Sequence, residues 1–153
     1  MGALPPYGRI AAVDYGTVRV GVAVSDPGRR IASPLASLSR GTPQSDARWF
    51  ADLAAREEIV GFVVGLPVGS GGGETQKSRE ARRFGEWLAQ STGLPVTYFD
   101  ERFTTVEADA ILSGTELTSK RRKQRRDMLA AQVLLTAFLE STTPQQEPGA
   151  LED

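Results

Sequence analysis

The sequence contains neither cysteine nor histidine among its 153 residues. Without thiolate or imidazole it lacks the usual ligands of zinc, the nucleophile of cysteine enzymes and the base of a Ser-His-Asp triad. It also forms no disulfide, which suits a reducing cytosol. The acidic side chains therefore remain as the main candidates for metal binding and catalysis.

Long apolar segments are missing as well. No run approaches the roughly 20 apolar residues that span a membrane, and residues 1–7 lack the basic and apolar parts of a secretion signal. We therefore expect a cytoplasmic protein with no membrane partner. The length suits one domain, which we predict over residues 1–140, followed by a disordered tail over residues 141–153 that contains proline and acidic residues.

Charge of one sign does not dominate the composition, since the net charge is −1. A nucleic-acid partner therefore does not follow from bulk composition. Basic residues nevertheless gather in one short run just before Asp127: Lys120, Arg121, Arg122, Lys123, Arg125 and Arg126. Such a run is either a solvated charged surface or a contact for phosphate groups.

The hydrophobic pattern predicts five strands. Residues 10–13 are a short apolar run, and valines alternate with other residues over 18–24, which indicates a strand with one buried face. Turn residues separate these from a third segment at 30–35, where Pro34 favours a sheet edge. Two more apolar runs follow at 60–66 and 96–99.

Helical spacing appears between and after the later strands. We predict helices over 44–58, 77–90, 104–114 and about 126–139. Three antiparallel strands followed by alternating helices and strands indicate an α/β fold. Its five-stranded mixed sheet carries helices on its faces.

The acidic residues of interest lie at the ends of these elements. Asp14 ends the first apolar run, Asp100 and Glu101 end the last one, and Asp127 opens the final helix. If the fold brings three of these carboxylates together, they form an oxygen-only site that suits Mg²⁺ or Mn²⁺. Adjacent strand residues face opposite sides, so Asp100 and Glu101 do not both point into one site unless the strand ends there.

The last helix gives Asp127 a defined direction. It shares one face with an apolar stripe, by i, i+3, i+4 spacing: Ala130, Ala131, Leu134, Leu135 and Phe138. A carboxylate on a core-facing stripe is costly unless it is paired or bound to metal. Two structural interpretations stay open, because Asp127 could complement the helix dipole or pair with an arginine.

Four segments, in order, resemble the YqgF/RuvX family of RNase H-like proteins. They are residues 12–26 (AVDYGTVRVGVAVSD), 64–67 (VGLP), 100–108 (DERFTTVEA) and 127–131 (DMLAA). The resemblance covers roughly residues 8–140 and implies an RNase H-like sheet. It also implies catalytic and metal-binding acids, which here are Asp14, Glu101 and Asp127, with Asp100 as a possible additional acid.

The family's activity implies a metal-dependent nuclease that uses two divalent cations to hydrolyse phosphodiester bonds. Nucleic acid, RNA or DNA, would be the partner, contacted by the basic run and by Thr17, Arg19 and Arg102. The family points to 5′-end processing of pre-16S rRNA, or alternatively to resolution of Holliday junctions. Junction resolution requires two symmetric cuts and hence a homodimer. A non-catalytic nucleic-acid-binding factor in transcription or ribosome assembly is the alternative of another class.

Overall fold

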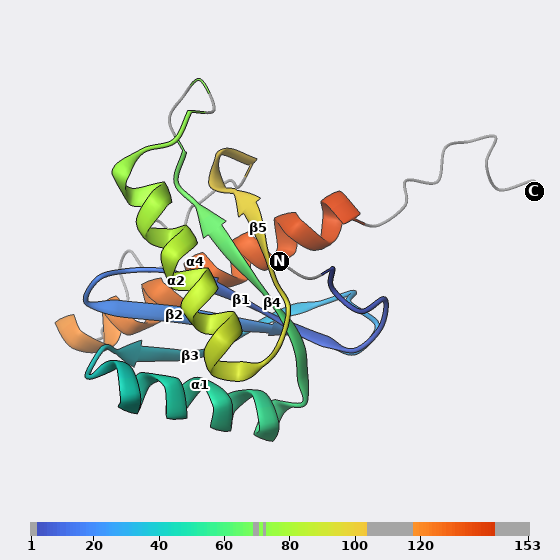
Figure 1. Ribbon diagram of the computed structural model, residues 1–153, viewed down its shortest axis with the longest axis horizontal. Helices are drawn as coiled ribbons and strands as arrows, with labels where there is room; N and C mark the ends of the chain where they lie inside the picture. The colour runs from blue at the N-terminus through green and yellow to red at the C-terminus, as the bar shows by residue number, and fades with distance from the viewer. Residues whose placement is uncertain (1–2, 69–70, 72, 104–117, 143–153) are drawn as a thin grey trace, which may run out of the picture.

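The structure is a computed structural model that describes residues 3–68, 71, 73–103 and 118–142. Five strands form one sheet in the order β3-β2-β1-β4-β5 (Figure 1). The strands are β1 (Arg9–Asp14), β2 (Arg19–Ser25), β3 (Ala32–Ser39), β4 (Ile59–Leu66) and β5 (Val96–Asp100). β1, β2 and β3 pair antiparallel, whereas β4 and β5 run parallel to β1. The predicted mixed sheet is therefore confirmed.

The central strands are buried on both faces. Ile10, Ala11, Ala12 and Val13 of β1 have no exposed surface, as their continuous apolar run predicts. β3 lies at the edge of the sheet, and its Pro34 sits opposite Ala23, next to a register shift. Proline is tolerated there because an edge strand need not donate every backbone N–H.

Two helices cover one face of the sheet. They are α1 (Pro43–Glu57) and α2 (Gln76–Thr92), and both begin at a threonine cap, Thr42 and Thr75, whose side chain accepts a backbone hydrogen bond. Their apolar stripes pack on the sheet with a cluster of large aromatic rings, among them Phe50 and Phe84. Figure 1 shows these helices on the side of the sheet opposite to α4.

The other face is covered by α4 (Ser119–Thr142). This helix begins at Ser119, earlier than the predicted start near Arg126, so the basic run forms its first turns. Lysine, arginine and glutamine are good helix formers, and the Thr118 side chain caps the helix by accepting from the Arg121 N–H at 3.2 Å. The predicted core-facing stripe is confirmed for Ala131, Leu134 and Leu135, which are buried.

Some predicted elements lie outside the described residues. These are the helix over 104–114 and residues 143–153 of the predicted tail. The first two residues of that predicted tail, 141 and 142, instead belong to α4, so the disorder predicted for them was wrong. Within the part of the chain that the structure describes, no helix combines the length and apolar content needed to cross a membrane.

Candidate active site

Asp14 ends β1 at the centre of the sheet. Its side chain shares a face with Ile10 and Ala12, which pack against α4, because alternate residues of a strand point the same way. In β2 its partner is Gly21. On the other side Val13 pairs with Val64, so Gly65 of β4 comes next in the register.

Asp127 lies directly over Gly21. A Cβ atom built on Gly21 would overlap the main-chain oxygen of Asp127 and lie 3.0 Å from the Asp127 Cβ. Only glycine leaves the room for this approach. The absence of a side chain in β2 therefore lets α4 bring Asp127 close to the neighbour of Asp14.

Glu101 lies over Gly65 in the same way. A Cβ atom on Gly65 would be 2.6 Å from Glu101 Oε2. Two glycines thus flank Asp14 in the sheet: the main chain and Cβ of Asp127 cover Gly21, and the Glu101 carboxylate covers Gly65. The row Gly21, Asp14 and Gly65 is the floor of the candidate site, and Asp127 and Glu101 form its two sides.

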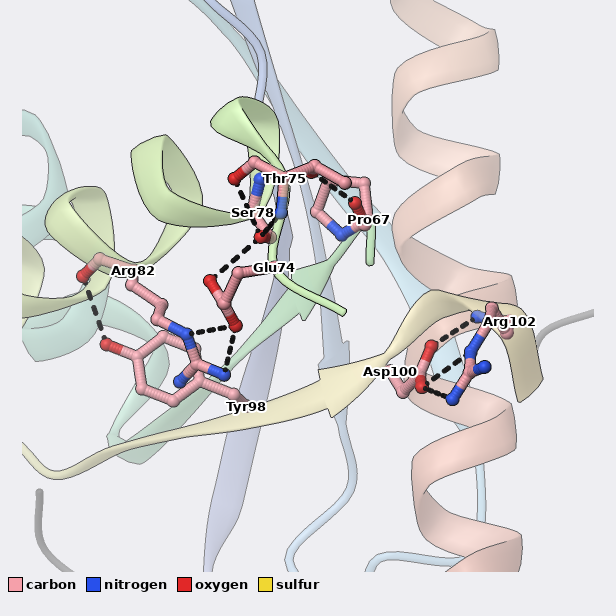
Figure 2. Close-up of polar contacts among 8 residues, drawn as sticks. All are labelled: Pro67, Glu74, Thr75, Ser78, Arg82, Tyr98, Asp100 and Arg102. Carbon is pink, nitrogen blue, oxygen red and sulfur yellow. Dashed lines mark hydrogen bonds and ion pairs between the residues drawn. The ribbon is translucent and has the colours of Figure 1, made fainter. Parts of the chain in front are cut away.

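Asp100 takes a different direction from its neighbour Glu101. The strand ends at Asp100, and a short 3-10 turn (Glu101–Phe103) follows. The Asp100 carboxylate accepts hydrogen bonds from the Arg102 backbone N–H at 2.8 Å and from its guanidinium at 2.6 Å (Figure 2). These bonds hold the pKa of Asp100 below its usual value. Strand alternation could not decide between the two acids, whereas the end of the strand separates them.

The electrostatics of the site centre on Asp14. Burial, with smaller contributions from the nearby negative charges of Glu101 and Asp127, raises the pKa of its carboxyl group to about 7. Among the described residues none donates a hydrogen bond to this carboxylate. Burial, with a smaller contribution from Asp100, also raises the pKa of Glu101. Asp14 therefore lies where burial and the neighbouring negative charges both disfavour its ionised form.

Asp127 is held by two residues of neighbouring strands. Arg19 Nε donates to Asp127 Oδ2 at 2.7 Å, and Ser37 Oγ donates to the same oxygen at 3.3 Å. The interpretation that Asp127 pairs with an arginine is thus confirmed, and the arginine is Arg19, a residue predicted to contact nucleic acid. Ser37 was not predicted, because no local pattern links it to a residue 90 positions away.

The donor set suits a hard cation. The side-chain oxygens of Asp14, Asp127 and Glu101 all belong to carboxylates, and the raised pKa of Asp14 reflects its burial first and the neighbouring negative charges second. In this conformation no three acidic side chains of the described residues converge closely enough to chelate one ion. Binding would therefore require small side-chain movements, among them at Glu101.

The remaining predicted contacts lie around this site. Most of the basic run is exposed along the first turns of α4, and Arg122 is half-buried. Thr17 is exposed in the turn after β1. Arg102 pairs with Asp100. The run leads along one helix directly to Asp127.

Comparison with known proteins identifies the family. The model of the family described as "RuvX: Holliday junction resolvase" matches residues 8–141. The chain belongs to the RuvX family.

Relatives and solved structures agree with this membership. A protein of Rhodopirellula baltica named "Putative pre-16S rRNA nuclease" is 54% identical over 90% of this chain and 79% of its own. One of Koribacter versatilis with the same name is 41% identical over 88% of each chain.

The solved structures are more distant. The RuvC resolvase of Thermus thermophilus, solved with a Holliday junction substrate, has a TM-score of 0.51 at 13% identity and covers 88% of this chain and 96% of its own. Fowlpox virus resolvase, also with junction DNA, has a TM-score of 0.52 at 13% identity, over 89% and 99%. At this identity the likeness concerns the fold, and it confirms the predicted RNase H-like sheet.

Proposed function

We propose that this RuvX-family chain is a metal-dependent nuclease that hydrolyses phosphodiester bonds at Asp14. The observation that carries the proposal is the row of Gly21, Asp14 and Gly65, in which the two glycines admit Asp127 and Glu101 beside an acid with a raised pKa. Family membership supports the same reaction class.

The side chains of the site have distinct roles in this proposal. Asp14, on the central strand, would hold metal from the middle of the site. Glu101 and Asp127 would hold it from either side. Mg²⁺ or Mn²⁺ held by these carboxylates would supply an activated water and would stabilise the leaving 3′ oxygen. Arg19 and Ser37 fix the orientation of Asp127, so that this carboxylate is held on rigid elements.

The end of the sheet that carries Asp14 also suits a polyanion. α1 follows the end of β3, whose Ser39 pairs with Arg19, and Thr75 at the start of α2 donates to Pro67 O just beyond β4. The N-termini of α1, α2 and α4 therefore all lie at this end, and helix N-termini favour negative charge. The basic run of α4 would add phosphate contacts through release of counterions.

The names of the relatives indicate a process. We propose that the substrate is the 5′ region of pre-16S rRNA, processed in the cytoplasm where ribosomes assemble. The family description favours a second candidate, the resolution of Holliday junctions by a homodimer with two sites. The Arg19 contact on Asp127 favours a third, a nucleic-acid-binding factor that keeps the acids paired and cleaves little.

Cleavage of end-labelled nucleic acids tests the proposal. Wild type, Asp14→Asn and the matched control Asp100→Asn are incubated with single-stranded RNA, pre-16S rRNA fragments, duplexes and four-way junctions in Mg²⁺, Mn²⁺ or EDTA. We expect metal-dependent products from wild type and from Asp100→Asn, and none from Asp14→Asn. Equal cleavage by Asp14→Asn would exclude this site. Binding without cleavage of any substrate would favour the binding factor.

A further inference from the structure

A small cavity opens at the same end of the sheet as Asp14, but on the opposite face. It has a volume of about 290 Å³, and its wall includes Tyr15, the residue directly after Asp14. Tyr15 packs against the aromatic cluster under α1 and α2, whereas Asp14 faces α4. A strand of nucleic acid that crosses this end of the sheet could therefore contact both sites.

Aromatic rings form one side of the cavity. Tyr15 and Phe84 lie 5.0 Å apart between ring centroids, and Phe84 and Trp87 lie 5.5 Å apart. Phe50, in the same cluster, is fully buried, but Tyr15 and Trp87 are only half-buried and line the opening. The cluster thus leaves parts of the Tyr15 and Trp87 rings accessible at the cavity, which sets Trp87 apart from a fully buried core residue such as Phe50.

A fixed guanidinium forms another side. The Arg40 guanidinium carbon lies 5.4 Å from the centroid of the Tyr15 ring and 5.6 Å from that of Phe84. Arg40 also donates to Gly16 O at 3.3 Å and pairs with the buried Asp46 at 3.8 Å. These contacts hold a planar cation in place before any ligand arrives, and nucleobases stack on such planes and on aromatic rings.

Size and charge narrow the class of ligand. A cavity of about 290 Å³ is at the lower limit for small-molecule sites and suits one heteroaromatic ring. Arg83 and Glu80 at the rim carry opposite charges, and Arg40 shares its charge with Asp46. This balance favours the neutral, flat face of a base over a tightly held phosphate.

We propose that this cavity binds one unpaired nucleobase of the strand whose backbone lies at Asp14. This inference rests on the proposed nuclease function and adds a substrate preference to it. A base inside a duplex is stacked and paired, so it reaches such a cavity only after it is flipped out. The protein should therefore prefer single-stranded or looped nucleotides near the cleaved bond.

Tryptophan fluorescence tests this directly, because the chain has only two tryptophans. Trp49 packs on Phe50 at 4.9 Å and does not line the cavity. In the Asp14→Asn, Trp49→Phe protein, Trp87 is the sole reporter and the bound strand is not cut. It is titrated with a single-stranded oligonucleotide, and in parallel with an abasic strand of equal length and charge.

We expect the oligonucleotide to quench Trp87 emission and the abasic strand to leave it unchanged. Trp87→Leu, which keeps apolar volume but removes the ring, should weaken binding of the oligonucleotide about fivefold to 100-fold relative to Trp49→Leu. It should not alter affinity for the abasic strand. Absence of quenching, or equal quenching by both strands, would overturn the inference.

The outcomes separate this inference from the proposed function. Metal-dependent cleavage by wild type without base-dependent quenching would remove the base site and leave the nuclease intact. Quenching together with unchanged cleavage by Asp14→Asn would remove the nuclease site and keep the base site.

Discussion

The buried cores on the two faces of the sheet differ in aromatic content. Under α1 and α2 the buried residues include three phenylalanines, Phe50, Phe62 and Phe84. Under α4 the buried residues are aliphatic, from Leu134 and Leu135 to the small Ala12 and Ala131, and at the site the sheet has glycine. We therefore expect the first face to supply more of the packing energy, whereas at the site the second face gives up side-chain volume so that charged groups can approach Asp14.

Phe50→Ala, on the aromatic face, should have the largest effect on stability. Its ring contacts the rings of Trp49, Phe62, Phe84 and Trp87, so truncation should lower the free energy of unfolding by about 3–5 kcal/mol. Denaturant unfolding measures this change. The folded variant should still bind Mn²⁺, because the ring faces away from the acids. A loss below about 1 kcal/mol would show that the aromatic face is not the main source of stability.

Asp14→Asn, on the other face of the sheet, should raise the stability of the metal-free protein rather than lower it. Because the folded pKa of Asp14 is raised from 3.8 to about 7, the folded state binds the proton more tightly than the unfolded state. Wild-type stability should therefore fall as the pH rises from about 4 to about 7. Above pH 7 the metal-free variant should be more stable than wild type by up to about 4 kcal/mol, at about 1.4 kcal/mol per pKa unit.

Unfolding in EDTA at pH 5 and pH 8 checks this prediction. The difference between the two proteins should shrink toward low pH, where Asp14 is protonated in both states. A difference that is independent of pH would mean that Asp14 does not titrate with a raised pKa. Added Mn²⁺ should stabilise wild type and leave the variant unchanged.

Gly21→Ala tests the close approach of α4. The added carbon would overlap the main chain of Asp127, which cannot rotate away, so the helix must move. We expect the free energy of unfolding to fall by about 1–3 kcal/mol and metal binding to weaken. Gly73→Ala is the matched control, since nothing lies within 4 Å of its added carbon. Equal stabilities for the two variants would contradict the proposed contact.

Gly65→Ala should have the smallest effect on stability. Its added carbon meets side-chain atoms, Glu101 Oε2 at 2.6 Å, Glu101 Cγ at 3.0 Å and Leu134 Cδ2 at 3.1 Å, which can shift more easily than the main chain that the Gly21 variant would meet. The free energy of unfolding should change by about 1 kcal/mol or less. The rate of cleavage should fall by about tenfold or more because one acid is displaced. Parallel unfolding and cleavage assays separate the two effects. A variant with full activity would show that the position of Glu101 is not critical.

The sequence allowed much of the fold to be predicted, because burial follows short-range patterns. The alternation of valines in β2 and the helical stripe behind Asp127 both indicated the correct faces. The predicted start of α4 was wrong, since a charged run gives no apolar period from which to place a helix boundary. The choice between Asp100 and Glu101 came from family resemblance, because alternation could not show where the strand ends.

The contacts that shape the candidate site could not be predicted from local patterns. Arg19 and Asp127 are 108 residues apart, and the need for glycine at 21 and 65 becomes visible only when α4 and Glu101 are placed over the sheet. The sequence predicted the candidate acids, whereas the tertiary structure shows which side chains surround them and how burial and neighbouring charges shift the pKa of Asp14.

Calorimetric titration of Mn²⁺ into metal-free wild type, Asp14→Asn and Asp100→Asn tests the central claim most directly. We expect binding to wild type and to Asp100→Asn with similar affinity, and loss of binding in Asp14→Asn, because Asp14 lies between the two other acids and Asp100 is paired with Arg102. Binding to Asp14→Asn as tight as to wild type would contradict a metal site built on this row of the sheet.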